Sequence, residues 1–182
     1  MSQKRKIILL DADVIIHFMK AEKHFHLPKI LPNFRLCVLD NVVEKELRRY
    51  KKGATEIDNL ILFKTIEEIP FPKNDFKSLI FKEFIQISRN PKRGLGESAC
   101  MAYARFNQNI LASSNLIDIK DYCQQHNIEY LTTMDILCEA LKQGVFTEAD
   151  CDDFIFIVKY EGSKLPVNKM SEFNCHQRIK LL

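Results

Sequence analysis

The chain has 182 residues, of which 46% are hydrophobic and 28% charged, with only five glycines and six prolines. This composition is typical of a globular protein and excludes the disordered and fibrous classes. The length suits one domain with a substantial core and is too short for two large domains. A formal net charge of +3 permits a nucleic-acid partner without arguing for one.

The N-terminal segment and the cysteines indicate the cellular compartment of the protein. Asp11 and Asp13 interrupt the first apolar run, so we expect a strand there and not an export signal. No stretch approaches the ~18 apolar residues of a membrane span, and no membrane partner is expected. The cysteines form neither a CxxC pair nor a zinc-like cluster, which favours free thiols in a reducing compartment. We therefore expect a soluble, cytoplasmic protein. The six cysteines are Cys37, Cys100, Cys123, Cys138, Cys151 and Cys175.

The first part of the chain alternates between strand and helix patterns. Residues 6–10 and 35–39 are short apolar runs, as expected for strands buried on both faces. Residues 14–23 favour a helix after the first run. A second helix is predicted from Asp40, as its cap, to about Tyr50, with Gly53 ending it. The next predicted elements are helices at 54–64 and 75–88, a proline-containing turn or edge segment at 66–72, and a basic loop at 88–96.

The alternation continues to the last helix. Helices are predicted at 97–106, 115–126, 134–144 and 147–160, and strands at 108–113 and 128–132. The tail from residue 161 is polar and has no clear period. Because the helical gaps are too long for hairpins, the pattern implies an α/β fold with a mostly parallel sheet covered by helices on both faces. We expect one three-layer domain at 1–145, with a C-terminal helix and tail at 146–182 packed on it or extending from it.

Acidic residues cluster where this sheet would bind a ligand, beyond the carboxyl ends of its strands. Those expected at this edge are Asp11, Asp13, Asp40, Glu44, Glu46, Glu97 and Asp118. Crowded carboxylates repel one another, and bound Mg²⁺ or Mn²⁺ relieves that repulsion because hard cations take oxygen ligands. Such metals activate water and neutralise a phosphodiester. Plain structural roles are the alternative: helix caps for Asp13 and Asp40, a solvated helix face for Glu44, and a first-turn charge for Glu97.

Four segments, in order, resemble the PIN-domain nucleases over roughly residues 6–143. IILLDADVII resembles the family's opening strand, whose aspartate is the leading metal ligand (Asp11), with Asp13 at a second small polar position. In LCVLDNVVEKEL the acid before the leucine corresponds to a ligand, Glu46. GLGESACMAYA is similar to a glycine-plus-glutamate helix start and points to Glu97. NILASSNLIDI and IEYLTT resemble the late strand–helix–strand.

The resemblance implies a metal-dependent endoribonuclease in which water attacks a phosphodiester, assisted by one or two Mg²⁺ or Mn²⁺ ions at Asp11, Glu46 and Glu97. The family includes ribosomal RNA processors and the toxins of toxin–antitoxin pairs. RNA, an antitoxin-like protein and a second copy of the chain are therefore the partners it suggests. Basic residues expected to flank the acids and contact phosphates, or to remain solvated surface charge, are Arg48, Arg49, Lys51, Lys52, Lys92 and Arg93.

The chain departs from the family pattern after the third strand. Many PIN sequences carry an aspartate pair there, where this chain has Ser113, Ser114 and Asn115. Either Asp118 supplies the missing charge or the site has three strong ligands. The second case favours an RNA- or protein-binding domain with little or no catalysis. A phosphatase or receiver relative is a further alternative, in which Asp11 and Asp13 would act as nucleophile and general acid. The sequence lacks a P-loop and a GxGxxG motif, which counts against nucleotide binding.

Overall fold

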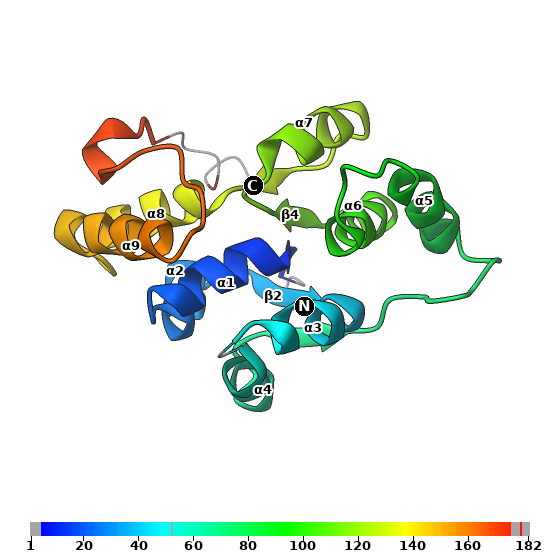
Figure 1. Ribbon diagram of the computed structural model, residues 1–182, viewed down its shortest axis with the longest axis horizontal. Coiled ribbons are helices and arrows are strands. Elements are labelled where there is room, and N and C mark those ends of the chain that lie inside the picture. The colour runs from blue at the N-terminus through cyan, green and yellow to red at the C-terminus, as the bar shows by residue number, and fades with distance from the viewer. Residues whose placement is uncertain (1–4, 52, 176–178, 180–182) are drawn as a thin grey trace.

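A computed structural model describes residues 5–51, 53–175 and 179. At its centre is a five-stranded parallel sheet with the order β3-β2-β1-β4-β5 (Figure 1). The predicted α/β class and mostly parallel sheet are therefore confirmed. The strands are β1 (Ile7–Leu10), β2 (Arg35–Leu39), β3 (Glu67–Ile69), β4 (Ile110–Ala112) and β5 (Tyr130–Leu131).

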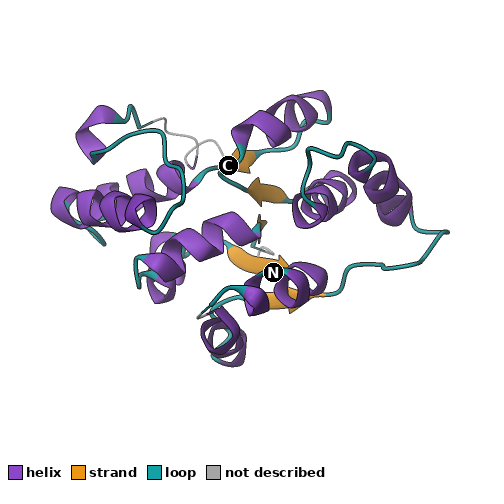
Figure 2. Cartoon of the chain, viewed as in Figure 1, coloured by secondary structure: helices purple, strands orange, loops and turns teal. Residues whose placement is uncertain are grey.

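Helices surround the sheet in two packed groups (Figure 2). One group is α1 (Ala12–Lys20), α2 (Leu27–Ile30), α8 (Thr133–Lys142) and α9 (Glu148–Tyr160). The other is α3 (Asp40–Lys45), α5 (Leu79–Ser88), α6 (Leu95–Asn107) and α7 (Leu116–Gln125), while α4 (Gly53–Leu62) packs near α1. Short 3₁₀ turns are η1 (His24–His26), η2 (Leu47–Arg49) and η3 (Met170–Glu172). No described helix is long and apolar enough to cross a bilayer.

The central strands place the first acidic residue. Ile8, Leu9 and Leu10 are fully buried, and burial of each such side chain contributes roughly 1.5–3 kcal/mol. β1 pairs in parallel with β4, so that the two strands end side by side. The backbone N–H of Asp11 then donates to the carbonyl of Ala112 at 2.9 Å. The ends of β1 and β4 therefore form one edge from which polar residues emerge.

The segment after β2 differs from the expected single helix. α3 ends at Lys45, because Glu46 takes φ −122° and ψ −59°, outside the helical region. Gly53 does not end that helix but begins α4, and a Cβ on it would overlap the backbone carbonyl of Leu47. Nor does Asp40 cap α3: the capping position is Leu39.

The carboxylate of Asp40 has another partner. Its Oδ1 accepts the backbone N–H of Phe71 at 3.0 Å, just beyond β3. β3 itself lies within the predicted turn or edge segment, and it pairs with β2 at the edge of the sheet. The prolines Pro70 and Pro72 follow the strand, where no ladder hydrogen bond is needed from them. Asp40 thus links the start of α3 to the segment after β3. It lies outside the group of acids described in the next subsection.

The C-terminal helix packs on the rest of the fold. The ring of Phe154 in α9 meets that of Phe18 in α1 edge-on, with 4.9 Å between centroids. The following segment returns along α9 (Figure 1), where Lys159 Nζ donates to Asn168 Oδ1 at 2.6 Å. The backbone N–H of Met170 donates to Asp152 at 2.6 Å. Residues 161–175 are therefore ordered by polar contacts, although their sequence shows no helical or strand periodicity. The domain boundary at 145 remains a prediction.

A disulfide joins Cys138 in α8 to Cys175, with 5.6 Å between their Cα atoms. The expectation of six free thiols is wrong for this pair. Their separation of 37 residues shows no recognisable spacing, and only the return of the C-terminal segment to α8 brings them together. The other four cysteines are free and buried: Cys37, Cys100, Cys123 and Cys151.

Cys175→Ser should lower the free energy of unfolding of the oxidised protein by about 2–4 kcal/mol, because the disulfide restricts the unfolded chain. Urea denaturation with and without dithiothreitol measures the effect. Under reducing conditions the variant and the wild type should coincide. Equal stabilities in both conditions, or six titratable thiols in the denatured, unreduced wild type, would contradict the bond.

Candidate metal centre

Asp11 lies at the end of β1 and caps α1. Its side chain is 6% exposed, and its Oδ1 accepts the N–H of Ala12 at 2.9 Å. Burial raises the pKa of this carboxyl well above its usual range, and the charges of Asp13, Glu97 and Glu46 raise it further. Since such repulsion weakens with distance, these four acids share one neighbourhood. The helix begins two residues earlier than predicted, because Asp11 and not Asp13 is its cap.

Asp13 connects α1 to the turn after β4. Its Oδ2 accepts the backbone N–H of Ser114 at 2.8 Å. Burial raises the pKa of Asp13 to about 6, against the lowering effect of this hydrogen bond. Its Oδ1 is buried and has no hydrogen-bond partner among the described residues. Asp13 therefore positions the loop after β4 and still has one oxygen available to a ligand.

Glu46 is placed by a close approach to α6. The backbone N–H of Gly96 hydrogen-bonds its carboxylate, which lowers a pKa that burial otherwise raises. A Cβ at Gly96 would overlap Glu46 Oε1, while its contact with Val42 would be an ordinary one. A glycine at this position therefore lets the Glu46 carboxylate reach the start of the helix that carries Glu97.

Glu97 is the most unusual acid of the group. Its side chain is 6% exposed, and neither carboxylate oxygen has a hydrogen-bond partner among the described residues. Burial, followed by the charges of Asp118 and Asp13, raises the pKa of Glu97 to about 8, although Arg93 opposes the shift. An isolated buried carboxylate is costly unless something compensates its charge. Glu97 lies in the first turn of α6, which begins at Leu95, two residues before the predicted start.

Asp118 is also near the group. It lies in the first turn of α7, partly exposed, and its Oδ2 accepts the side-chain N–H of Asn115 at 2.6 Å. After burial, the charge of Asp118 is the next largest cause of the raised pKa of Glu97, so the two carboxylates interact through space. The predicted acids are therefore linked electrostatically: Asp13, Glu46 and Glu97 act on Asp11, and Asp118 acts on Glu97. That they hold one metal ion together remains a prediction.

The position of the family's aspartate pair carries a different network. The Ser114 hydroxyl lies 2.6 Å from Thr133 Oγ1, which lies 2.9 Å from His17 Nδ1. Burial lowers the pKa of His17 to about 4, so its ring is neutral at physiological pH. Ser113 contributes more weakly, with its hydroxyl 3.5 Å from Asp13. Neither His17 nor Thr133 is among the residues that the sequence predicts for the site; Thr133 ends the IEYLTT segment, but that resemblance points to no ligand there.

The donor set suits a hard divalent cation, because it consists of carboxylate oxygens. Three of those oxygens are buried and have no hydrogen-bond partner within residues 5–51, 53–175 and 179: both on Glu97 and Oδ1 of Asp13. In their present orientations, no three described His, Cys, Asp or Glu side chains are arranged to hold a metal ion. Binding would therefore need rotation of carboxylates within a site whose residues are already neighbours.

The predicted phosphate-contacting residues are differently placed. Arg48 forms an ion pair with Asp58 of α4 at 2.9 Å, whereas Arg93 lies near Glu97 and lowers its pKa. Arg49 and Lys92 are exposed, and Lys52 lies outside the described residues. Glu44, on the solvated face of α3, pairs with Lys73 at 3.0 Å. Of these residues, Arg93 has the clearest connection to the acids.

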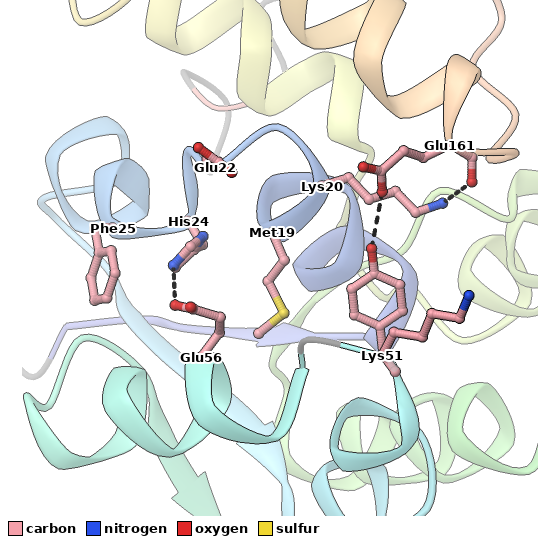
Figure 3. Close-up of a pocket in the computed structure, with 9 residues that line it drawn as sticks. Met19, Lys20, Glu22, His24, Phe25, Lys51, Glu56 and Glu161 are labelled. Carbon is pink, nitrogen blue, oxygen red and sulfur yellow. Dashed lines mark hydrogen bonds and ion pairs between the residues drawn. The ribbon is translucent and has the colours of Figure 1, made fainter.

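A separate cavity of about 670 Å³ lies at the last turn of α1, away from the acids at its first turn (Figure 3). Lys51 lines it. Its polar groups bind one another: His24 lies 3.0 Å from Glu56, and Lys20 donates to the carbonyl of Glu161 at 2.8 Å. None of the five acids lines this cavity.

No protein-family model matches the chain, and no curated protein matches its sequence.

Proposed function

We propose that the protein is a divalent-metal-dependent endoribonuclease of the PIN type. Glu97 carries the proposal, because it is a buried carboxylate that no described residue hydrogen-bonds, and the charges of other acids act on it at the carboxyl edge of a parallel sheet. This arrangement is unfavourable by itself and becomes favourable with a cation. The expected site in open α/β sheets is at this same edge.

Asp11, Glu46 and Glu97 would hold Mg²⁺ or Mn²⁺, with Asp13 and Asp118 adding negative charge. When bound, the ion supplies an activated water and neutralises charge on the phosphodiester. The chain contributes orientation: the N–H of Gly96 fixes Glu46, and the N–H of Ser114 fixes Asp13. Arg93, beside Glu97, is suitably placed to meet a phosphate. The charge of Asp118 acts on Glu97, which supports Asp118 as the substitute for the family's missing aspartate.

A second candidate is a PIN-like domain that binds RNA or a protein with little or no turnover. Two observations favour it: Ser113 and Ser114 stand in place of the aspartate pair, and no three described acids are arranged for coordination. The toxin role, an antitoxin-like partner, a homodimer and the cytoplasmic location all remain predictions.

Cleavage of a labelled single-stranded RNA with Mn²⁺, compared with EDTA, separates the two candidates. The nuclease proposal predicts metal-dependent cleavage that Asp11→Asn reduces by more than about 100-fold, since a direct ligand outweighs an outer-shell group. Glu44→Gln is the matched control, because this exposed acid pairs with Lys73. RNA binding without any cleavage would support the binding domain instead.

A further inference from the structure

A cavity of about 610 Å³ adjoins the acidic cluster and shares Asp13 with it. This volume lies within the range of roughly 300–1,000 Å³ that is usual for pockets holding small organic groups. Its walls come from distant parts of the chain. Leu116 and Ile117 of α7 contribute one part, and Leu165, Pro166 and Phe173 of the C-terminal segment another.

The polar groups of this cavity are mostly uncharged or already engaged. His17 is neutral because burial lowers its pKa to about 4, and Ser114 bonds to Thr133. Thr132 caps α8, and the carboxylate of Asp135 completes the capping box by accepting the N–H and hydroxyl of Thr132. Among the described residues, Lys164 is the one lysine or arginine that lines the cavity, and its side chain is exposed. Two carboxylates, Asp13 and Asp135, therefore disfavour a phosphate inside.

Apolar walls beside hydrogen-bonding groups, which here are the His17 ring, the Ser114 hydroxyl and two carboxylates, suit a flat heteroaromatic group that carries N–H donors. Through Asp13, the cavity lies next to the place where the phosphate of a nucleic acid would meet the metal centre. We propose that this cavity binds one unpaired nucleobase of single-stranded RNA while the adjacent phosphate occupies the acidic site. The inference rests on the proposed nuclease function and deepens it, because it assigns a base-binding subsite.

The C-terminal segment thereby has a role that its sequence did not suggest. It is held in place by the Cys138–Cys175 disulfide and by the bond from Lys159 to Asn168. Lys20 also donates to the hydroxyl of Ser163 at 2.8 Å, immediately before the residues that line the cavity. A wall ordered before the ligand arrives loses less conformational entropy on binding.

The test compares two fluorescent six-nucleotide chains, one of RNA and one of abasic tetrahydrofuran phosphodiesters. Anisotropy titrations in Ca²⁺ measure their affinities; both chains carry the same backbone charge. Wild-type protein should bind RNA at least about tenfold more tightly, the usual effect of stacking one base. Phe173→Ala should remove most of that preference and leave abasic binding unchanged. Ile117→Ala, at a cavity residue 92% exposed, should weaken RNA selectively without disturbing folding.

Phe156→Ala on α9 is the matched control: this phenylalanine is 66% exposed and does not line the cavity. Equal binding of both chains by the wild type would overturn the base pocket while leaving the nuclease proposal standing. Unchanged RNA affinity in both cavity variants would also overturn the base pocket and leave the nuclease proposal standing. If neither chain binds, the proposed function fails and the base pocket falls with it.

Discussion

Glu97→Gln should make the metal-free protein more stable at pH 8 and abolish its stabilisation by Mn²⁺. The carboxylate is buried near other acids and has no hydrogen-bond partner in the described part of the chain, so removing its charge relieves repulsion. We expect a gain of roughly 1–3 kcal/mol in the free energy of unfolding, given about 1.4 kcal/mol for each unit of pKa shift and allowing for an unpaired amide. In Mn²⁺ the order should reverse, because only the wild type binds the ion.

The pH dependence of the wild type's stability follows from the raised pKa of Glu97. The pKa of Glu97 rises from 4.5 to about 8 on folding, so this group favours the folded state most below pH 4.5. Its contribution is lost as the pH rises toward 8, since the unfolded chain releases the proton more readily. Thermal unfolding between pH 5 and 8 checks this. The Glu97→Gln variant should lack this part of the decline, and Glu44→Gln should retain it. Identical pH profiles for the wild type and Glu97→Gln would contradict the role given to this carboxylate.

Gly96→Ala should reduce metal-dependent cleavage by at least about 100-fold while leaving stability nearly unchanged. The added methyl group would occupy the space of the Glu46 carboxylate and force that flexible side chain away. The loss of a direct metal ligand should reduce activity by more than the roughly 10–100-fold that follows from mutating an outer-shell partner. Alanine favours a helix by about 1 kcal/mol over glycine, which offsets the lost hydrogen bond from the backbone of residue 96.

Gly94→Ala is the matched control, two residues earlier at the same helix start. Its Cβ would meet only the Cβ of Glu97, at an ordinary 3.9 Å, so cleavage should remain close to that of the wild type. Steady-state cleavage assays and urea denaturation on both variants give the two quantities. Full activity in Gly96→Ala, or equal losses in the two variants, would show that the position of Glu46 is unimportant.

Local pattern predicts much of this fold. The apolar runs at 6–10 and 35–39 become β1 and β2, because a strand buried on both faces needs a continuous apolar sequence. The helix after β2 is shorter than predicted, because its end is set by a tertiary contact. Glu46 leaves the helical conformation and meets Gly96, which is distant in sequence. Helical propensity at residues 46–50 carries no information about that partner.

The order of the acids along the chain predicts a shared site, and their binding of one metal ion remains a prediction. The burial and hydrogen bonding of each acid cannot be predicted in this way. Acids that follow parallel strands must emerge at one edge, so their order along the chain predicts that they meet. Burial and hydrogen bonding depend on three-dimensional contacts. The hydrogen bond from Ser114 to Asp13, and the lack of one to Glu97 from any described residue, depend on how α1, α6 and the turn after β4 pack. The disulfide to Cys175 escapes prediction for the same reason, because a polar tail without a period shows no return path to α8.

Calorimetric titration of Mn²⁺ into the wild type and into Asp11→Asn at pH 8 tests the central claim most directly. We expect saturable binding by the wild type, accompanied by proton release because the pKa values of Asp11 and Glu97 are raised before the ion binds. In Asp11→Asn the affinity should fall by more than about 100-fold. Absence of saturable binding in the wild type, or equal affinity in the variant, would contradict a metal centre at this edge of the sheet.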